Sequence, residues 1–130
     1  MLNTRIDGDI SFSHVGFKFE SRDEPLFKDL NLKIRKGEKV GFVGTSGCGK
    51  STVQQLIQRF YDADSGEILI DGHNIKDYDI HHLRASLGVV SQEPVLFNNT
   101  IGWNIQYNRT ETSRSEIIAA ANESNYNPEA

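Results

Sequence analysis

The sequence predicts a domain of the α/β class, and three observations lead to that class. Apolar residues alternate with other residues over 9–19 and 30–34, which is the pattern of half-buried strands, and a short apolar strand is predicted over 67–70. Residues 44–49 form a glycine-rich loop between an apolar, β-rich run and a segment with helical spacing. From residue 94 onward the sequence favours helices.

The N-terminal third predicts strands. The alternation over 9–19 changes phase near Ser13 or His14, so we expect a break in the first strand there. A polar turn over 21–25 separates it from a half-buried strand over 30–34. A turn at 36–38 then leads into a strand over 38–43, which feeds the glycine-rich loop.

The central segment predicts a helix and then shorter elements. Four apolar residues after the loop are spaced i, i+3, i+4, i+7, which predicts a helix from Lys50 to Tyr61. A polar stretch over 62–66 stops it. A strand over 67–70 ends at the hairpin signal Asp71-Gly72. A short helix over 79–85 and an apolar strand over 87–91 follow.

The C-terminal part carries helix-capping signals. Asn99 or Thr100 is placed to cap a short helix that runs through Gln106. Ser113 and Glu116 form a capping box before a second helix. We therefore predict two regions, an α/β core over 1–94 and the beginning of a helical region over 95–130.

Composition limits the functional classes. The chain has 130 residues, enough for one compact domain, and its net charge of −4 gives no sign of a nucleic-acid surface. No apolar run approaches the length of a membrane span, so we expect a soluble chain without membrane insertion. The single cysteine, Cys48, excludes an intrachain disulfide and suits a reducing cytosol.

The loop itself, GTSGCGKST, matches the phosphate-binding pattern of Gly44, Gly49, Lys50 and Ser51. Glycines let the backbone approach a ligand, and successive N–H groups form an anion-binding cup at a helix N-terminus. The lysine would contact β- and γ-phosphates and the serine hydroxyl would hold Mg²⁺. The candidate nucleotide-binding residues of the loop are Gly44, Thr45, Ser46, Gly47, Cys48, Gly49, Lys50, Ser51 and Thr52. Cys48 lies inside the cup, so we predict a reactive thiol that nucleotide protects.

In its order of motifs the chain resembles the nucleotide-binding domain of ATP-binding-cassette (ABC) transporters, of the multidrug-exporter kind typified by P-glycoprotein. The resemblance rests on the phosphate loop, on SGEILIDG at 65–72, on LRASLGVVSQEPVLF at 83–97, on NTIGWNI at 99–105 and on VGFKF at 15–19. It covers nearly the whole chain. It implies a P-loop NTPase-like α/β core with an antiparallel β subdomain and the start of a helical subdomain, in a truncated form.

The resemblance also implies roles for residues outside the loop. Phe19 would stack on adenine, and Arg22 would reach the nucleotide. Gln92 would be catalytic, because it would touch Mg²⁺ and the attacking water and couple nucleotide state to the transmembrane part. Residue 20 is glutamate where the family often has proline, which departs from the expected geometry of the turn.

The family's signature sequence, its Asp-Glu strand end and its switch histidine do not occur in the 130 residues. We therefore expect this chain to bind Mg-ATP with little hydrolysis by itself. The resemblance places the parent ATPase in a membrane, with this part on the cytosolic face and with a second nucleotide-binding domain and transmembrane domains as partners. It also implies that the strand over 38–43 has an exposed apolar edge.

Two other classes use similar loops. A small P-loop kinase shares a GxSGxGKST loop but would need an acceptor site and lid arginines, which the segments at 65–72 and 89–97 do not fit. A GTPase would need an Asn-Lys-x-Asp guanine reader, and none is present. The kinase remains the alternative at this stage.

Overall fold

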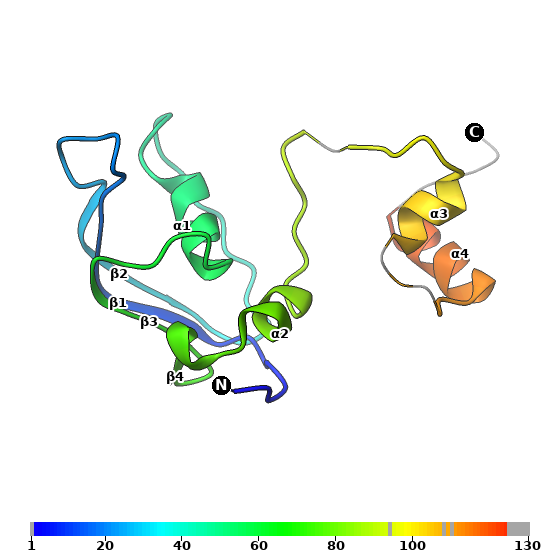
Figure 1. The fold of residues 1–130 in the computed structure, drawn as a ribbon, viewed down its shortest axis with the longest axis horizontal. Coiled ribbons are helices and arrows are strands. Elements are labelled where there is room, and N and C mark those ends of the chain that lie inside the picture. The colour runs from blue at the N-terminus through cyan, green and yellow to red at the C-terminus, as the bar shows by residue number, and fades with distance from the viewer. Residues whose placement is uncertain (1, 94, 108, 110, 125–130) are drawn as a thin grey trace. The chain divides into compact units, whose positions relative to one another are not determined.

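The computed structural model describes residues 2–93, 95–107, 109 and 111–124. The chain divides into two compact units, Met1–Val89 and Val90–Ala130. The first contains a four-stranded sheet and helices α1 and α2, and the second contains helices α3 and α4 (Figure 1).

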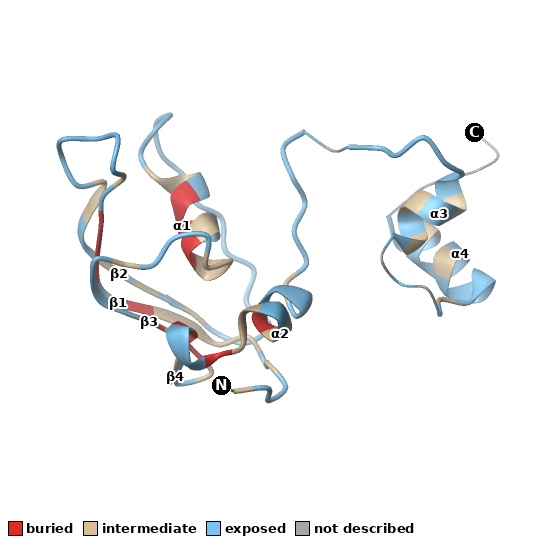
Figure 2. Cartoon of the chain, viewed as in Figure 1, coloured by how far each residue is buried: buried red, intermediate tan, exposed pale blue. Residues whose placement is uncertain are grey.

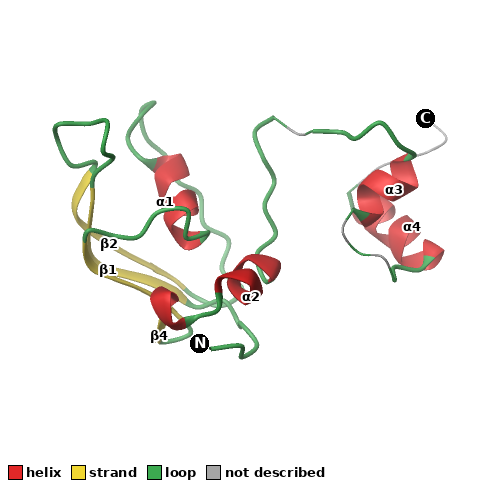
Figure 3. Cartoon of the chain, viewed as in Figure 1, coloured by secondary structure: helices red, strands yellow, loops and turns green. Residues whose placement is uncertain are grey.

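The sheet of the first unit is antiparallel throughout (Figure 3). Its central strand β1 (Ile10–Phe17) pairs with β2 (Phe27–Ile34) on one side and with β3 (Ser65–Ile70) on the other, and β3 pairs with β4 (His73–Asn74). A 3₁₀ helix η1 (Ile75–Asp77) and helix α2 (Ile80–Ala85) follow. The strands predicted over 9–19, 30–34 and 67–70 and the helix predicted over 79–85 are confirmed.

The predicted break in the first strand is a bulge at His14. Both pairings of β1 change register there, and His14 has a positive φ of 50°. The extra residue moves Phe12 and Val15 onto the same buried side. On the neighbouring strand the bulge leaves no room for a side chain, because a Cβ at Gly66 would overlap the carbonyl oxygens of Ser13 and His14.

The Asp71-Gly72 turn between β3 and β4 is also confirmed, with φ angles of 51° and 79°. The Asp71 carboxylate accepts hydrogen bonds from the backbone N–H groups of Asp7, Gly8 and Asp9 at 2.6, 3.0 and 2.9 Å. These bonds fix the segment that enters β1 to the hairpin.

The core lies between the sheet and helix α1 (Lys50–Ile57). Val53 and Leu56 on α1 and Leu83 on α2 are buried together with side chains of β1 and β3 (Figure 2). Truncating a fully buried leucine such as Leu56 to alanine would cost about 3 kcal/mol. This packing attaches the helix that follows the glycine-rich loop to the sheet.

Helix α1 ends earlier than predicted, at Ile57 and not at Tyr61. The N–H of Phe60 donates to Gln55 O at 3.0 Å and the N–H of Arg59 donates to Leu56 O at 3.0 Å, which is a Schellman closure. Arg59 takes the left-handed position with φ 53°, where glycine is usual and another residue costs roughly 1–2 kcal/mol. An arginine at this position carries no sequence signal for a helix end.

The strands predicted over 38–43 and 87–91 are wrong, because neither segment is a strand in the structure. Val43 is fully exposed and Val90 is 89% exposed. An extended apolar segment becomes a strand only when another strand supplies its hydrogen-bond partners. Among the residues that the structure describes, no strand pairs with either segment.

The second unit is helical, as predicted. In α3 (Ile101–Gln106), the Thr100 hydroxyl caps the helix by accepting from Trp103 N–H. In α4 (Arg114–Glu123), both bonds of the Ser113–Glu116 capping box are present. Neither helix buries a residue, and the rings of Phe97, Trp103 and Tyr107 form an aromatic cluster, with Phe97 and Tyr107 stacked 4.8 Å apart.

Candidate functional site

The glycine-rich loop adopts backbone angles that favour glycine. Gly47 and Gly49 have φ angles of 78° and 104°, and Gly49 is the N-cap residue of α1. A Cβ at Gly49 would lie 2.5 Å from Phe27 Cζ on β2, and one at Gly44 would lie 2.6 Å from Cys48 Sγ. A side chain at Gly49 would have to displace the Phe27 ring, and one at Gly44 would have to displace the Cys48 side chain.

The Lys50 ammonium is hydrogen-bonded to the backbone of the glycine-rich loop. Its Nζ donates to the carbonyl oxygens of Gly44 and Thr45, each at 2.8 Å, and lies 3.7 Å from Cys48 Sγ. These bonds hold a positive charge against the loop backbone.

The two hydroxyl residues at the start of α1 face different surroundings. Ser51 is exposed on the first turn, whereas Thr52 is buried at 6% exposure on the side of the helix that faces the core. The glycine N-cap makes no side-chain bond to the first turn. The N–H groups of that turn have no partner within the helix, so they are available to an anion.

An aromatic cluster lies at the end of β1. Phe19 is half-buried and packs edge-on against Phe17, with centroids 4.8 Å apart, and against Tyr61, at 5.3 Å. These rings line an open pocket of about 520 Å³ together with Lys18, Glu20, Ser21, Asp62 and Asp64. Phe17 also pairs with Phe27, the residue that contacts Gly49, so β2 links this pocket to the glycine-rich loop.

Sequence reasoning did not single out Tyr61. It lies forty-two residues from Phe19 in the sequence, and the apolar spacing counted it as the last residue of α1. In the structure Tyr61 lies beyond the end of α1, and its ring packs on Phe19.

The structure does not test the roles predicted for two other residues. The backbone N–H of Arg22 donates to Phe19 O at 3.0 Å, which closes the turn after β1, but the Arg22 side chain does not line the pocket. Gln92 is exposed and belongs to the second unit. The roles of Arg22 and Gln92 stay predictions.

Metal-binding clusters and membrane-spanning helices are both absent from the part of the chain that the structure describes. No cluster of histidine, cysteine or acidic side chains there could hold a metal ion by itself. None of its helices has the length and apolar character needed to cross a membrane.

Comparisons with known proteins agree with the order of motifs. The model of the ABC transporter family matches residues 27–129. The chain is 47% identical over 125 residues to ABC transporter B family member 2 of Dictyostelium discoideum, covering 95% of this chain and 9% of that protein. It is 48% identical over 118 residues to a putative multidrug export ATP-binding/permease protein of Staphylococcus aureus, covering 91% of this chain and 20% of that protein.

A solved structure gives the same result in three dimensions. A bacterial Atm1-family ABC exporter with ATP bound superposes with a TM-score of 0.84 at 42% identity, covering 96% of this chain and 22% of that one. The chain thus spans roughly a tenth to a fifth of the length of these relatives. The small-kinase alternative is set aside by these matches, and the chain belongs to the ABC transporter family.

Proposed function

We propose that this chain is the ATP-binding part of an ABC exporter and binds Mg-ATP through the loop Gly44–Thr52. The observation that carries the proposal is the position of Lys50, whose ammonium is held by the Gly44 and Thr45 carbonyls beside the free N–H groups of the first turn of α1. A fixed cation beside unpaired N–H groups is suited to the phosphates of a nucleotide.

The residues also fit a bound Mg²⁺ ion and an adenine ring. Ser51 is exposed on the first turn, where its hydroxyl would be a ligand of an ion that screens the phosphate charge. Phe19 would supply one aromatic face to the base, in the open pocket that it shares with Tyr61. The roles proposed for Gln92 as a Mg²⁺ ligand and for Arg22 as a nucleotide contact rest on the family resemblance alone.

The proposal extends to the whole protein. Residues 1–94 would be the ATP-binding core and residues 95–130 the beginning of the helical subdomain. The complete exporter would couple ATP hydrolysis to transport, with this part on the cytosolic face of the membrane beside transmembrane domains and a second nucleotide-binding domain. The chain alone would hydrolyse little ATP, because its 130 residues include no Asp-Glu strand end to orient the attacking water.

Titration with a fluorescent ATP analogue tests the binding site. We expect Lys50→Ala to weaken binding by about tenfold or more, because the ammonium contacts phosphate directly. Lys33→Ala, which removes an exposed lysine from β2, is the matched control and leaves affinity unchanged. Ser51→Ala abolishes the gain in affinity that Mg²⁺ gives the wild type. Binding that survives Lys50→Ala undiminished would exclude this site.

A phosphate-release assay under the same conditions tests the second claim. We expect release close to the rate without protein. Sustained turnover that depends on Lys50 would contradict the proposal that this chain binds without hydrolysing.

A further inference from the structure

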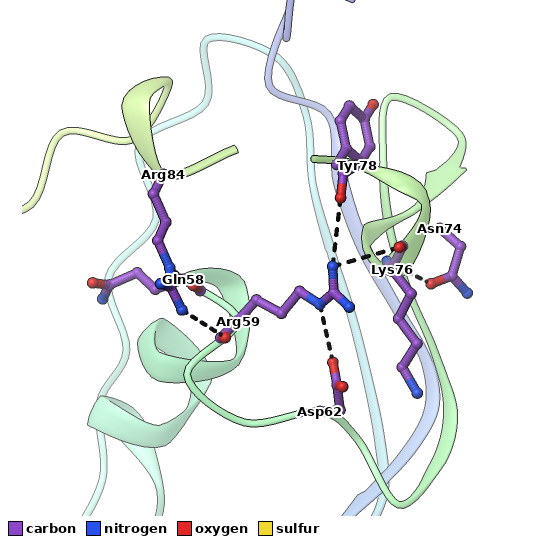
Figure 4. A network of polar contacts seen from close by, with 7 residues as sticks. All are labelled: Gln58, Arg59, Asp62, Asn74, Lys76, Tyr78 and Arg84. Carbon is purple, nitrogen blue, oxygen red and sulfur yellow. Dashed lines mark hydrogen bonds and ion pairs between the residues drawn. The ribbon is translucent and has the colours of Figure 1, made fainter. Parts of the chain in front are cut away.

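The two ends of helix α1 are held by different parts of the sequence. Lys50 and Ser51 lie at its first turn, and the helix of eight residues is only about 12 Å long. Its last turn is held by two arginines, Arg59 just beyond the helix and Arg84 on α2 (Figure 4).

Arg59 reaches away from the helix. Its Nε donates to Asp62 Oδ1 at 3.2 Å, and its Nη1 donates to the carbonyl oxygens of Lys76 and Tyr78 at 3.4 and 3.5 Å. The side chain is only 22% exposed. A glycine would satisfy the left-handed backbone at this position without strain, but it would make none of these contacts.

Arg84 reaches in the opposite direction, into the end of the helix. Its Nε donates to Gln58 O at 3.1 Å and its Nη2 donates to Arg59 O at 3.0 Å. These carbonyls have no partner within the helix, and a cation is favourable at a helix C-terminus. The guanidinium also lies 5.0 Å from the centre of the Phe60 ring.

Together the two arginines join the last turn of α1 to the segment 76–84 from both sides. We propose that Arg59 and Arg84 are positioning residues for nucleotide binding, which hold α1 at the angle that presents Lys50 and Ser51 to the phosphates. This inference rests on the proposed function of the loop. Because the helix is short and stiff, releasing its C-terminal end would let it tilt and would move the first turn. Only the fraction of molecules with the helix at the correct angle would then bind nucleotide.

The test compares dissociation constants for the fluorescent ATP analogue with Mg²⁺, measured on the full chain well below each variant's melting temperature. We expect Arg59→Gly and Arg84→Ala each to weaken binding about five- to tenfold, since affinity falls with the competent fraction. Arg84→Lys keeps the charge but has one nitrogen where the guanidinium uses two, so its affinity should be intermediate. The Arg59→Gly variant separates the backbone role of residue 59 from its side-chain role. It relieves the strain of the left-handed backbone and removes the side-chain contacts.

Tyr78→Phe is the control for general destabilisation. It removes a buried hydrogen bond from Tyr78 Oη to Ile70 O at 2.9 Å and leaves the Tyr78 carbonyl available to Arg59. We expect a lower melting temperature with unchanged affinity. Equal weakening in Tyr78→Phe, or wild-type affinity in both arginine variants, would overturn the inference. Absence of binding by the wild type would instead reject the proposed function itself.

Discussion

Substituting Gly66 by alanine tests how closely β3 approaches the bulge in β1. Gly66 has a φ of 71°, and its Cβ would overlap the carbonyl oxygens of Ser13 and His14. The positive φ costs alanine roughly 1–2 kcal/mol. The overlap adds a further 1–3 kcal/mol or so, as overpacking does, because backbone oxygens cannot rotate away. We expect a loss of about 3 kcal/mol in the free energy of unfolding.

Gly72→Ala is the matched control. Gly72 has a similar φ of 79° and lies in the turn at the other end of β3, but a Cβ there would meet nothing within 4 Å. It should lose only the backbone contribution of roughly 1–2 kcal/mol. Urea denaturation of both variants, followed by far-UV circular dichroism, gives the difference. Tryptophan fluorescence is unsuitable, because the single tryptophan, Trp103, lies in the second unit.

The difference between the two variants decides the question. If Gly66→Ala and Gly72→Ala lose the same stability within error, the close approach at the bulge is wrong. If both are as stable as the wild type, the left-handed backbone at these positions is wrong as well.

Four further predictions concern other parts of the molecule. Phe19→Ala should weaken binding of the ATP analogue several-fold and leave inorganic triphosphate unaffected; equal loss for both would remove the ring from the base site. Alkylation of Cys48, which is exposed, should slow when Mg-ATP is added, and an unchanged rate contradicts its place in the cup. Partial burial raises the pKa of the Asp71 carboxyl, but hydrogen bonds from backbone N–H groups outweigh burial and leave the pKa below its ordinary value. The stability that the carboxylate contributes is therefore full at neutral pH and is lost as the pH falls below about 4. Asp71→Asn should reduce this loss of stability at acid pH, measured by denaturation at a series of pH values. Ser113→Ala should lower the helicity of α4 and cost about 1 kcal/mol, measured by circular dichroism against the wild type.

Local signals in the sequence predicted much of the fold. The phase change near His14 predicted the bulge, Asp71-Gly72 predicted the hairpin, and Ser113 with Glu116 predicted the start of α4. Each of these signals is complete within a few residues. The glycine-rich loop was recognisable for the same reason, since its glycines, lysine and serine lie at fixed spacing.

The features that depend on distant residues could not be read in this way. Segments 38–43 and 87–91 have the composition of strands, but pairing requires a neighbour that composition does not supply. The end of α1 requires Arg59 to adopt a left-handed backbone conformation that is usual for glycine. The residues that contact this end of the helix lie in the segment 76–84. The packing of Tyr61 on Phe19 also joins residues that lie far apart in the sequence.

The bulge at His14 also constrains how this sequence can change during evolution. The steric exclusion of a Cβ at position 66 comes from the extra residue in β1, because the atoms that it would overlap belong to the backbone of Ser13 and His14. No replacement of those two side chains would release position 66. Deleting one residue from 13–14 would remove this overlap, and would also return Phe12 and Val15 to opposite sides of the strand. Two sites more than fifty residues apart are therefore expected to vary together, through a change in length at one and a change in residue type at the other.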